Sequence, residues 1–223
     1  MPHIVIPAAG ADEYDRHYRE WVEAQGPRAL DLDWRLTHLD WRQRALLRRY
    51  PPEGKRVLDF GCMDGVFTLR LQQLGGTSVG YDISPAAVAQ AKRFRGPTPR
   101  PVFTTVPPGP GQFDLIYCSE HLEHVENDSA LVRELVGYLA PGGSVVGTTP
   151  VGVGEPAGDG EPSDSEQKRF YDDLALKRAL GASGRVRVDR YYRSPFRNFL
   201  PMKQKSPAIF IFQVTPQNPP GAR

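Results

Sequence analysis

Short apolar runs alternate with amphipathic segments through the middle of the chain, over residues 55–150. The runs have the length of buried strands, and the segments between them carry apolar residues at helical spacing. Such alternation predicts right-handed βαβ units and therefore a parallel sheet with helices on both faces. The expected strands are "RVLDF", "SVGYDI", "PVFTTV", "FDLIYCS" and "SVVGTTP", and the expected helices are "GVFTLRLQQLG", "SPAAVAQAKRF" and "NDSALVRELVGYLAPGG".

Particular residues mark where these helices begin and end. Ser84 is a favourable N-cap residue, and Pro85 suits the first position of the helix that follows. Gly75 is expected to end the preceding helix, since glycine is common just beyond a helix C-terminus. These boundaries support the strand and helix assignments.

Residues 12–50 are rich in aromatic residues and arginine, as in "EYDRHYREW" and "DWRLTHLDWRQRALLRRY". In the second of these segments, apolar residues recur roughly on one helical face, which predicts a helix. The sequence "PPEG" that follows is expected to end this helix. The residues on the apolar face are Leu36, Leu39, Leu46, Leu47 and Tyr50.

The alternation of strands and helices stops after Pro150. Residues 151–168 are rich in glycine, proline and acidic residues, which predicts a surface loop or lid. A helix, "DDLALKRALG", is expected next with Asp172 as its cap, followed by the strands "RVRVDRYYR" and "AIFIFQVTP". Because no good helix separates these two strands, we expect them to form an antiparallel pair at the edge of the sheet.

Together these patterns predict a single α/β domain over residues 1–223. Its fold is a Rossmann-like, seven-stranded, mostly parallel sheet with helices on both faces and an antiparallel C-terminal strand pair. Residues 12–50 form an N-terminal helical cap, residues 55–150 form the ligand-binding core, and residues 169–223 complete the sheet.

Composition narrows the class of protein further. The 223 residues, of which 39% are hydrophobic, suit one domain with a sizeable core, and a net charge of +2 gives no reason to expect nucleic acid as a partner. The two cysteines have no framework spacing, and no segment is apolar over the length of a bilayer. The N-terminus is too short and uncharged for a signal peptide. We therefore expect a cytoplasmic protein, of an oligomeric state that the sequence leaves open.

The stretch "VLDFGCMDGVFTLRL" places a glycine-containing turn between a strand and a helix. Gly61 and Gly65 permit a tight turn and close approach to the backbone, and Asp59 lies at its start. Asp82 follows Asp59 by 23 positions, at the end of the next strand. An acid there is placed to accept hydrogen bonds from ribose hydroxyls, which indicates a cofactor that contains a nucleoside.

A dinucleotide is the first candidate for this cofactor, but the turn departs from the G-x-G-x-x-G pattern. Met63 stands where a second glycine would let a pyrophosphate approach, and Asp64 would repel phosphate. A cofactor with a ribose but no phosphate fits better, and S-adenosylmethionine is such a molecule. An ordinary strand–helix turn is the alternative interpretation.

Four motifs in order resemble those of the class I S-adenosylmethionine-dependent methyltransferases. They are "VLDFGCMDG", "VGYDIS", "FDLIYCSEHLEHV" and "LAPGGSVVGTTP". Within that class they are most similar to the ubiquinone-biosynthesis type and its small-molecule relatives. The resemblance covers residues 55–150 well and the remainder loosely, so it implies the fold and cofactor more strongly than the acceptor.

The resemblance also implies roles for single residues. Asp82 would hold the ribose hydroxyls, Ile83 would touch the adenine, and Asp59 would support the turn. The segment "TTVPPGPGQ" lacks the acid that usually holds the adenine amino group, and Met63 narrows the pocket. The residues implied at the methionyl and amino-acid end are Gly61, Cys62, Gly65, Cys118 and Ser119, and those at the reaction mouth are Glu120 and His121.

Methyl transfer requires mainly that nucleophile, methyl carbon and sulfur are held in line. A hydroxyl nucleophile also needs a base, and an imidazole suits neutral pH. We therefore predict His121 and Glu120 as the catalytic groups.

A divalent metal ion is an alternative way to activate a hydroxyl. If "SEHLEHV" is helical, Glu120, Glu123 and His124 lie on one face and could bind such an ion. This pattern resembles the metal motif of small-RNA 2′-O-methyltransferases, which have a further histidine after the fifth strand. No histidine follows His124 in this chain, so simple acid–base or helix-capping roles are favoured.

The cap offers a second candidate site. Its aromatic residues would either cover the cofactor cleft or simply pack on the sheet. Arg42 or Arg44 would pair with the cofactor carboxylate, as arginines in similar segments do. The aromatic residues concerned are Tyr14, Tyr18, Trp21, Trp34 and Trp41.

The sequence thus predicts an S-adenosylmethionine-dependent methyltransferase that acts on a hydroxyl group of a small molecule, such as a phenol, sugar or natural product. The alternatives are an N- or C-methyltransferase, an RNA 2′-O-methyltransferase, and a cofactor-binding module without catalysis. Neither membranes nor nucleic acids are expected as partners.

Overall fold

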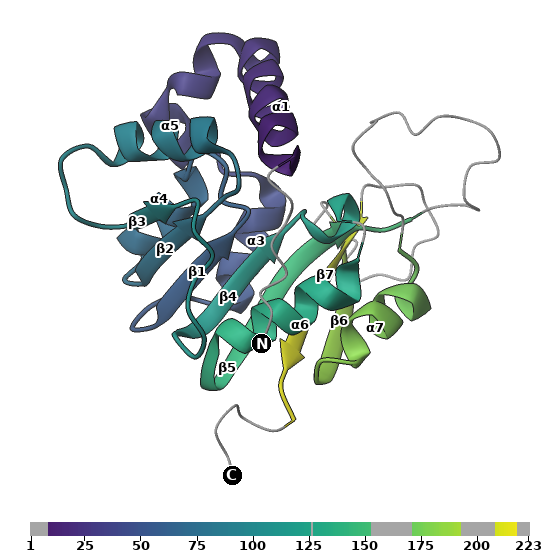
Figure 1. Cartoon of the computed structure of the whole chain (residues 1–223). Helices are drawn as coiled ribbons and strands as arrows, with labels where there is room; N and C mark the ends of the chain where they lie inside the picture. Colours follow the sequence, from purple (N-terminus) through teal and green to yellow (C-terminus); the bar gives the residue numbers. More distant parts are fainter. Residues whose placement is uncertain (1–8, 126, 153–170, 193–207, 218–223) are drawn as a thin grey trace, which may run out of the picture.

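The computed structural model describes residues 9–125, 127–152, 171–192 and 208–217. Their centre is a seven-stranded sheet of order β3-β2-β1-β4-β5-β7-β6 (Figure 1). The order reverses between β1 and β4, and the carboxyl ends of parallel strands at such a point are where α/β sheets bind ligands. The strands are β1 Arg56–Phe60, β2 Thr77–Tyr81, β3 Val102–Thr104, β4 Phe113–Ser119, β5 Leu139–Pro150, β6 Arg185–Tyr192 and β7 Ala208–Thr215.

Strands β1 to β5 pair with one another in parallel, and β7 runs antiparallel between β5 and β6. The predicted fold, including the antiparallel pair at the edge, is therefore confirmed. The helices are α1 Ala9–Gln25, α2 Leu32–Thr37, α3 Trp41–Arg49, α4 Val66–Gln73, α5 Pro85–Arg95, α6 Asp128–Tyr138 and α7 Asp173–Gly181, with 3-10 turns η1 Gly26–Leu30 and η2 Leu122–His124.

Buried apolar residues form a core on each face of the sheet. Alternate residues of β1 show the division, because Leu58 and Phe60 face the core that α6 and α7 complete, whereas Val57 faces the core under α3 and α4. Side-chain caps fix the helix starts as predicted: Ser84 accepts the amide of Ala87 at 3.1 Å. Asp172 likewise caps α7.

The helix expected across residues 36–50 is two helices, which corrects that prediction. The α2 helix ends at Thr37, and the amide of His38 donates to the carbonyl of Trp34 at 2.9 Å. Asp40 then accepts the amide of Arg42 at 2.8 Å and starts α3. Because the side chain of Asp40 binds a backbone amide as an N-cap, a new helix starts there. The apolar periodicity continues across the junction between the two helices and does not reveal it.

The cap helices are fastened to both halves of the sheet. Figure 1 shows α1 standing beside α5, where Asp15 accepts the amide of Ala86 at 3.0 Å and the hydroxyl of Ser84. At the other edge, Arg48 of α3 donates to the hydroxyl of Tyr191 in β6 at 2.6 Å. The cap is therefore held to the start of α5 by α1 and to β6 by α3.

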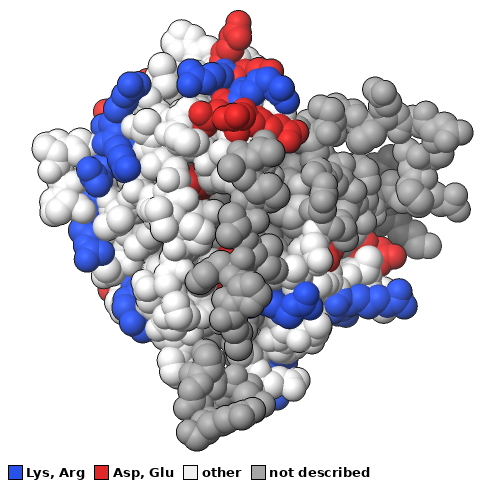
Figure 2. Space-filling view, in the orientation of Figure 1, with Lys and Arg blue, Asp and Glu red and all other residues white. Residues whose placement is uncertain are grey.

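Figure 2 shows acidic and basic side chains together over α1, whereas the other described surface of this face is mainly uncharged, with basic side chains at its margins. No described helix is long and apolar enough to cross a membrane. The loop or lid predicted at residues 151–168 lies outside the described residues from residue 153 on. The division of the chain into cap, core and C-terminal part stays a prediction.

Candidate active site

Two buried carboxylates lie at the carboxyl ends of β1 and β2. Asp59 accepts the hydroxyl of Thr68 at 2.6 Å, and burial raises its pKa to about 7. Asp82 accepts the amide of Met63 at 2.8 Å through one oxygen and the amide of Ser84 at 2.9 Å through the other. Burial raises the pKa of Asp82, and these two amides oppose that rise because they favour the ionised form.

The turn after β1 is held against β2 by its own amides. The N–H groups of Gly61 and Cys62 both donate to the carbonyl of Tyr81 at 2.9 Å. Gly61 and Gly65 have φ near +78°, a conformation that glycine adopts without strain. A Cβ at Gly61 would come within 2.7 Å of Nδ1 of His121, so the glycine is required by the protein's own packing. The implied contact of this turn with the methionyl group stays a prediction.

The remaining residues implied at the cofactor differ in exposure. Cys62 and Cys118 are buried thiols in the cores, and burial raises the pKa of both. Neither thiol is therefore exposed to a ligand. Ile83 and Ser119 are half-buried, and the hydroxyl of Ser119 lies 2.8 Å from that of Thr148.

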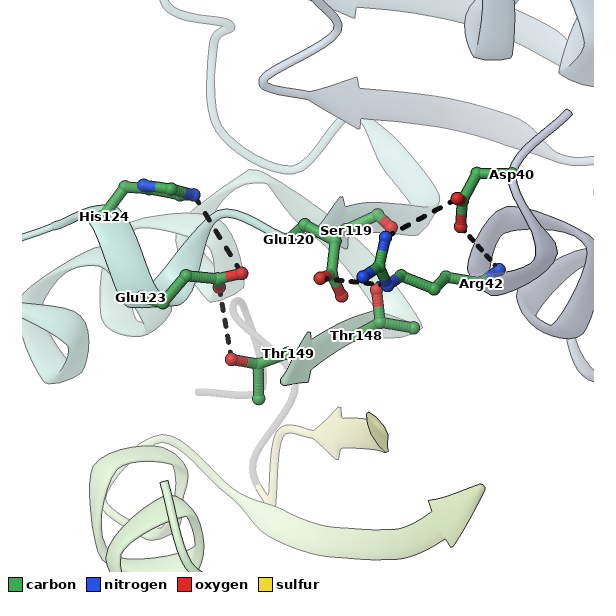
Figure 3. A network of polar contacts seen from close by, with 8 residues as sticks. All are labelled: Asp40, Arg42, Ser119, Glu120, Glu123, His124, Thr148 and Thr149. Atoms are coloured by element: carbon green, nitrogen blue, oxygen red, sulfur yellow. Dashed lines mark hydrogen bonds and ion pairs between the residues drawn. The ribbon is translucent and has the colours of Figure 1, made fainter. Parts of the chain in front are cut away.

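Glu120 follows β4 directly and has the strained, left-handed φ of +51°. Its amide donates to the carbonyl of Thr148 at 2.9 Å, and its Oε2 lies 3.2 Å from Nε of Arg42 (Figure 3). Its Oε1 is buried without a hydrogen-bond partner in the described part of the chain. Burial and the nearby Glu123 raise the pKa of Glu120 to about 7, whereas Arg42 opposes the rise.

Glu123 is the more deeply buried of the two glutamates, with 1% of its surface exposed. Its Oε2 accepts the hydroxyl of Thr149 at 3.1 Å, and its Oε1 lies 4.0 Å from Nε2 of His124. Burial raises its pKa to about 7. Two carboxyl groups at the end of β4 thus titrate near neutral pH.

His121 connects the glutamates with the glycine turn. Its ring packs edge-on against Phe60 at 5.3 Å between centroids and fills the space beside Gly61. Burial lowers its pKa to about 4, so the imidazole is neutral at pH 7. A neutral imidazole accepts a proton, but with this pKa it is a weaker base than Glu120.

The helical face expected for Glu120, Glu123 and His124 does not form. The left-handed conformation of Glu120 ends β4, and only one 3-10 turn, η2, follows it. Figure 3 shows Glu120 directed toward Arg42 while Glu123 lies against His124 and Thr149. Over the described residues, no group of three histidine, cysteine or acidic side chains is placed to hold a metal ion.

Most aromatic residues of the cap contact the cap itself or the edge of the sheet. Trp34 stacks on His38 at 4.4 Å, and Trp41 stacks on Tyr191 at 6.4 Å. Trp21 lies against Tyr18 and under the guanidinium of Arg35. These contacts support the packing role for most of the cap aromatics.

Sequence reasoning missed the ion pairs that join the cap to the site. Arg35 of α2 pairs with the buried Asp64 of the glycine turn, and Arg42 of α3 pairs with Glu120. The sequence indicates Asp64 only as a group that would repel phosphate. Nothing in a single sequence indicates which of many arginines neutralises a given acid, because the partners are far apart along the chain.

The comparisons with known proteins agree with this geometry. A family model described as a methyltransferase domain matches residues 24–184. The chain is 33% identical over 128 residues to the ubiquinone biosynthesis O-methyltransferase of Albidiferax ferrireducens, covering 54% of this chain and 46% of the relative. It is 27% identical over 146 residues to the mitochondrial ubiquinone biosynthesis O-methyltransferase of Schizosaccharomyces pombe, covering 62% and 53%. The chain thus spans about half the length of these curated relatives.

Solved structures share the fold. An S-adenosylmethionine-dependent methyltransferase from Mesorhizobium loti matches with a TM-score of 0.59 and 20% identity, over 83% of this chain and 100% of that one. Magnesium protoporphyrin IX methyltransferase from Synechocystis matches with a TM-score of 0.61 and 16% identity, over 96% and 99%. The chain belongs to the methyltransferase-domain family. The predicted membership of the methyltransferase family is therefore confirmed.

Proposed function

We propose that this chain methylates a hydroxyl group of a small molecule. The curated relatives named above are O-methyltransferases of ubiquinone biosynthesis, which supports transfer to oxygen. Their similarity covers 54% and 62% of this chain, so the acceptor is argued from the residues of this chain.

The residues at the ends of β1 and β2 fit the cofactor. Each oxygen of Asp82 already accepts one amide and retains a further lone pair, so the carboxylate can accept two ribose hydroxyls without losing its own support. Hydrogen bonds to an ionised group are the stronger kind, and the two amides keep this group oriented. When bound, S-adenosylmethionine supplies an electrophilic methyl group on a positively charged sulfur.

The observation that carries the proposal is the carboxylate of Glu120 at the end of β4, the strand that pairs with β1. A hydroxyl must lose a proton as it is methylated, and a base works best when its pKa lies near the working pH. The pKa of Glu120 is about 7, and Arg42 holds the carboxylate in place. Its Oε1 is buried without a hydrogen-bond partner in the described part of the chain and has lone pairs that can take up a proton. His121 lies between this group and the turn, where its neutral imidazole positions the acceptor or accepts the proton itself.

The test combines binding with turnover. Calorimetry should show binding of S-adenosylhomocysteine, and mass spectrometry should detect methylated products from a panel of phenols, catechols and sugars. A matched panel of amines is the control. Methylation of amines alone would contradict transfer to oxygen, and tight binding of a nicotinamide dinucleotide without S-adenosylhomocysteine binding would contradict the cofactor.

A further inference from the structure

Met63 is an unusual residue for the position it occupies in the glycine turn. Its φ is +48°, in the left-handed region that an L side chain adopts only at a cost. Glu120 is the other non-glycine residue with a positive φ among those that the structure describes. Residues held in such conformations cluster at ligand clamps and active sites, where the surrounding structure enforces them.

The backbone of Met63 is fixed to the carboxylate that the proposed function assigns to the cofactor ribose. Its amide donates to Oδ2 of Asp82 at 2.8 Å. The amides of Cys62 and Gly65 on either side are also paired, with the carbonyls of Tyr81 and Cys62 at 2.9 Å. The turn is therefore rigid around this residue. The Met63 side chain is attached directly to the backbone segment that is hydrogen-bonded to Asp82.

The side chain of Met63 is nevertheless left exposed. With 38% of its surface accessible, it is one of the few large apolar residues of the described chain that are not covered. Its neighbours in the turn are buried, with Cys62 at 5% and Asp64 at 1%. A flexible thioether is well suited to the flat face of an aromatic ring, with which its sulfur makes favourable contacts.

Residues 105–112, which follow β3, carry no charged side chain, so this segment has no carboxylate to hold an adenine amino group. Apolar contact must then supply more of the affinity for the base. We propose that the Met63 side chain packs on the adenosine part of S-adenosylmethionine and determines much of its affinity. This inference rests on the proposed function, because it takes the cofactor as given.

Three variants separate the side chain from the backbone strain. Met63→Leu keeps an apolar side chain in the same conformation. Met63→Asn removes the apolar contact but tolerates the left-handed region, and Met63→Gly removes both the contact and the strain. The Kd of S-adenosylhomocysteine and of 5′-methylthioadenosine, which shares the adenosine part, would be measured by calorimetry on the full chain.

We expect Met63→Leu to bind within about twofold of the wild type and both Met63→Asn and Met63→Gly to bind about tenfold more weakly, as expected when part of a buried apolar side chain is lost. The same loss should appear with 5′-methylthioadenosine. The ligand-free Met63→Gly protein should melt about 2–4 °C higher, since the strain is relieved.

Unchanged affinity in Met63→Asn and Met63→Gly would overturn the inference while leaving the proposed function intact, provided that Asp82→Ala still weakens binding. A wild-type chain that binds neither ligand would overturn both. A loss confined to S-adenosylhomocysteine would place Met63 at the amino-acid end of the cofactor and would also contradict the inference.

Discussion

The carboxyl edge of the sheet has two halves, one at the ends of β1 and β2 and one at the end of β4, and their carboxylates are paired differently. At the ends of β1 and β2, the oxygens of Asp82 are paired with backbone amides and Asp59 is paired with Thr68. At the end of β4, Glu120 keeps one oxygen without a partner in the described part of the chain, and its pKa is about 7. We propose that the first half binds the cofactor, whereas the second holds the group that exchanges a proton.

Each half contains a non-glycine residue in the left-handed conformation. Met63 and Glu120 have left-handed φ values of +48° and +51°, one in each half. In the first half the backbone amide of Met63 donates to the acid that is proposed to bind ribose. In the second half the left-handed conformation turns a carboxylate away from the line of β4 toward Arg42. If the two halves have the roles proposed, variants in one should affect binding and variants in the other should affect turnover.

The largest effect is expected from Glu120→Gln. Loss of a general base lowers turnover by about two to four orders of magnitude, while the Kd of S-adenosylhomocysteine should stay within about twofold. In the wild type, kcat/KM should rise with pH through about 7, because the carboxylate acts as a base only when ionised. That rise should be absent in Glu120→Gln.

The matched control for this prediction is Asp40→Asn, and His121→Ala tests the alternative base. Asp40→Asn alters another carboxylate beside Arg42 and should retain turnover. If Glu120→Gln retained turnover and His121→Ala lost it, the imidazole of His121 would be the base in place of Glu120.

The next effect concerns the cap over the cofactor half. Arg35 pairs with Asp64, which is 1% exposed, so Arg35→Ala leaves a buried carboxylate without its partner. Breaking such a pair costs about 3–5 kcal/mol of unfolding free energy. Arg42→Ala acts on the more exposed pair with Glu120 and should cost less. Urea unfolding of both variants measures the difference in unfolding free energy. Equal losses would contradict the prediction, because the two ion pairs would then stabilise the protein to the same extent.

A smaller effect is expected from Asp82→Ala. It removes charge-assisted hydrogen bonds to the ribose, so the Kd of S-adenosylhomocysteine should increase about 10–100-fold. Asp82→Asn keeps the shape of the side chain and should weaken the binding of S-adenosylhomocysteine less. Turnover at saturating cofactor should change far less than in Glu120→Gln, and a drop in kcat without a change in Kd would remove the distinction between the halves.

The extent to which sequence predicted the site follows the same division. The cofactor half is local: a strand, a turn and a helix in one stretch specify Asp59, Gly61 and Gly65, and strand order brings Asp82 beside them. The acceptor half depends on contacts between distant segments, such as Arg42 with Glu120. The helix considered as one possibility for "SEHLEHV" does not form, because Glu120 is left-handed and only a 3-10 turn follows it.

The last and smallest prediction uses pH to compare two neighbours in the acceptor half. Glu120 has a folded pKa of about 7, above its usual value, so the folded state holds this proton more tightly and stability falls as pH rises from about 5 to 7.5. His121 has a folded pKa of about 4, below its usual value, so its contribution increases over the same range. Glu120→Gln should therefore flatten the decline in unfolding free energy between pH 5 and 7.5, and His121→Phe should steepen it, each by about 1 kcal/mol. Urea unfolding at the two pH values measures both slopes, and changes of the same sign in the two variants would show that one of these groups does not titrate as its surroundings dictate.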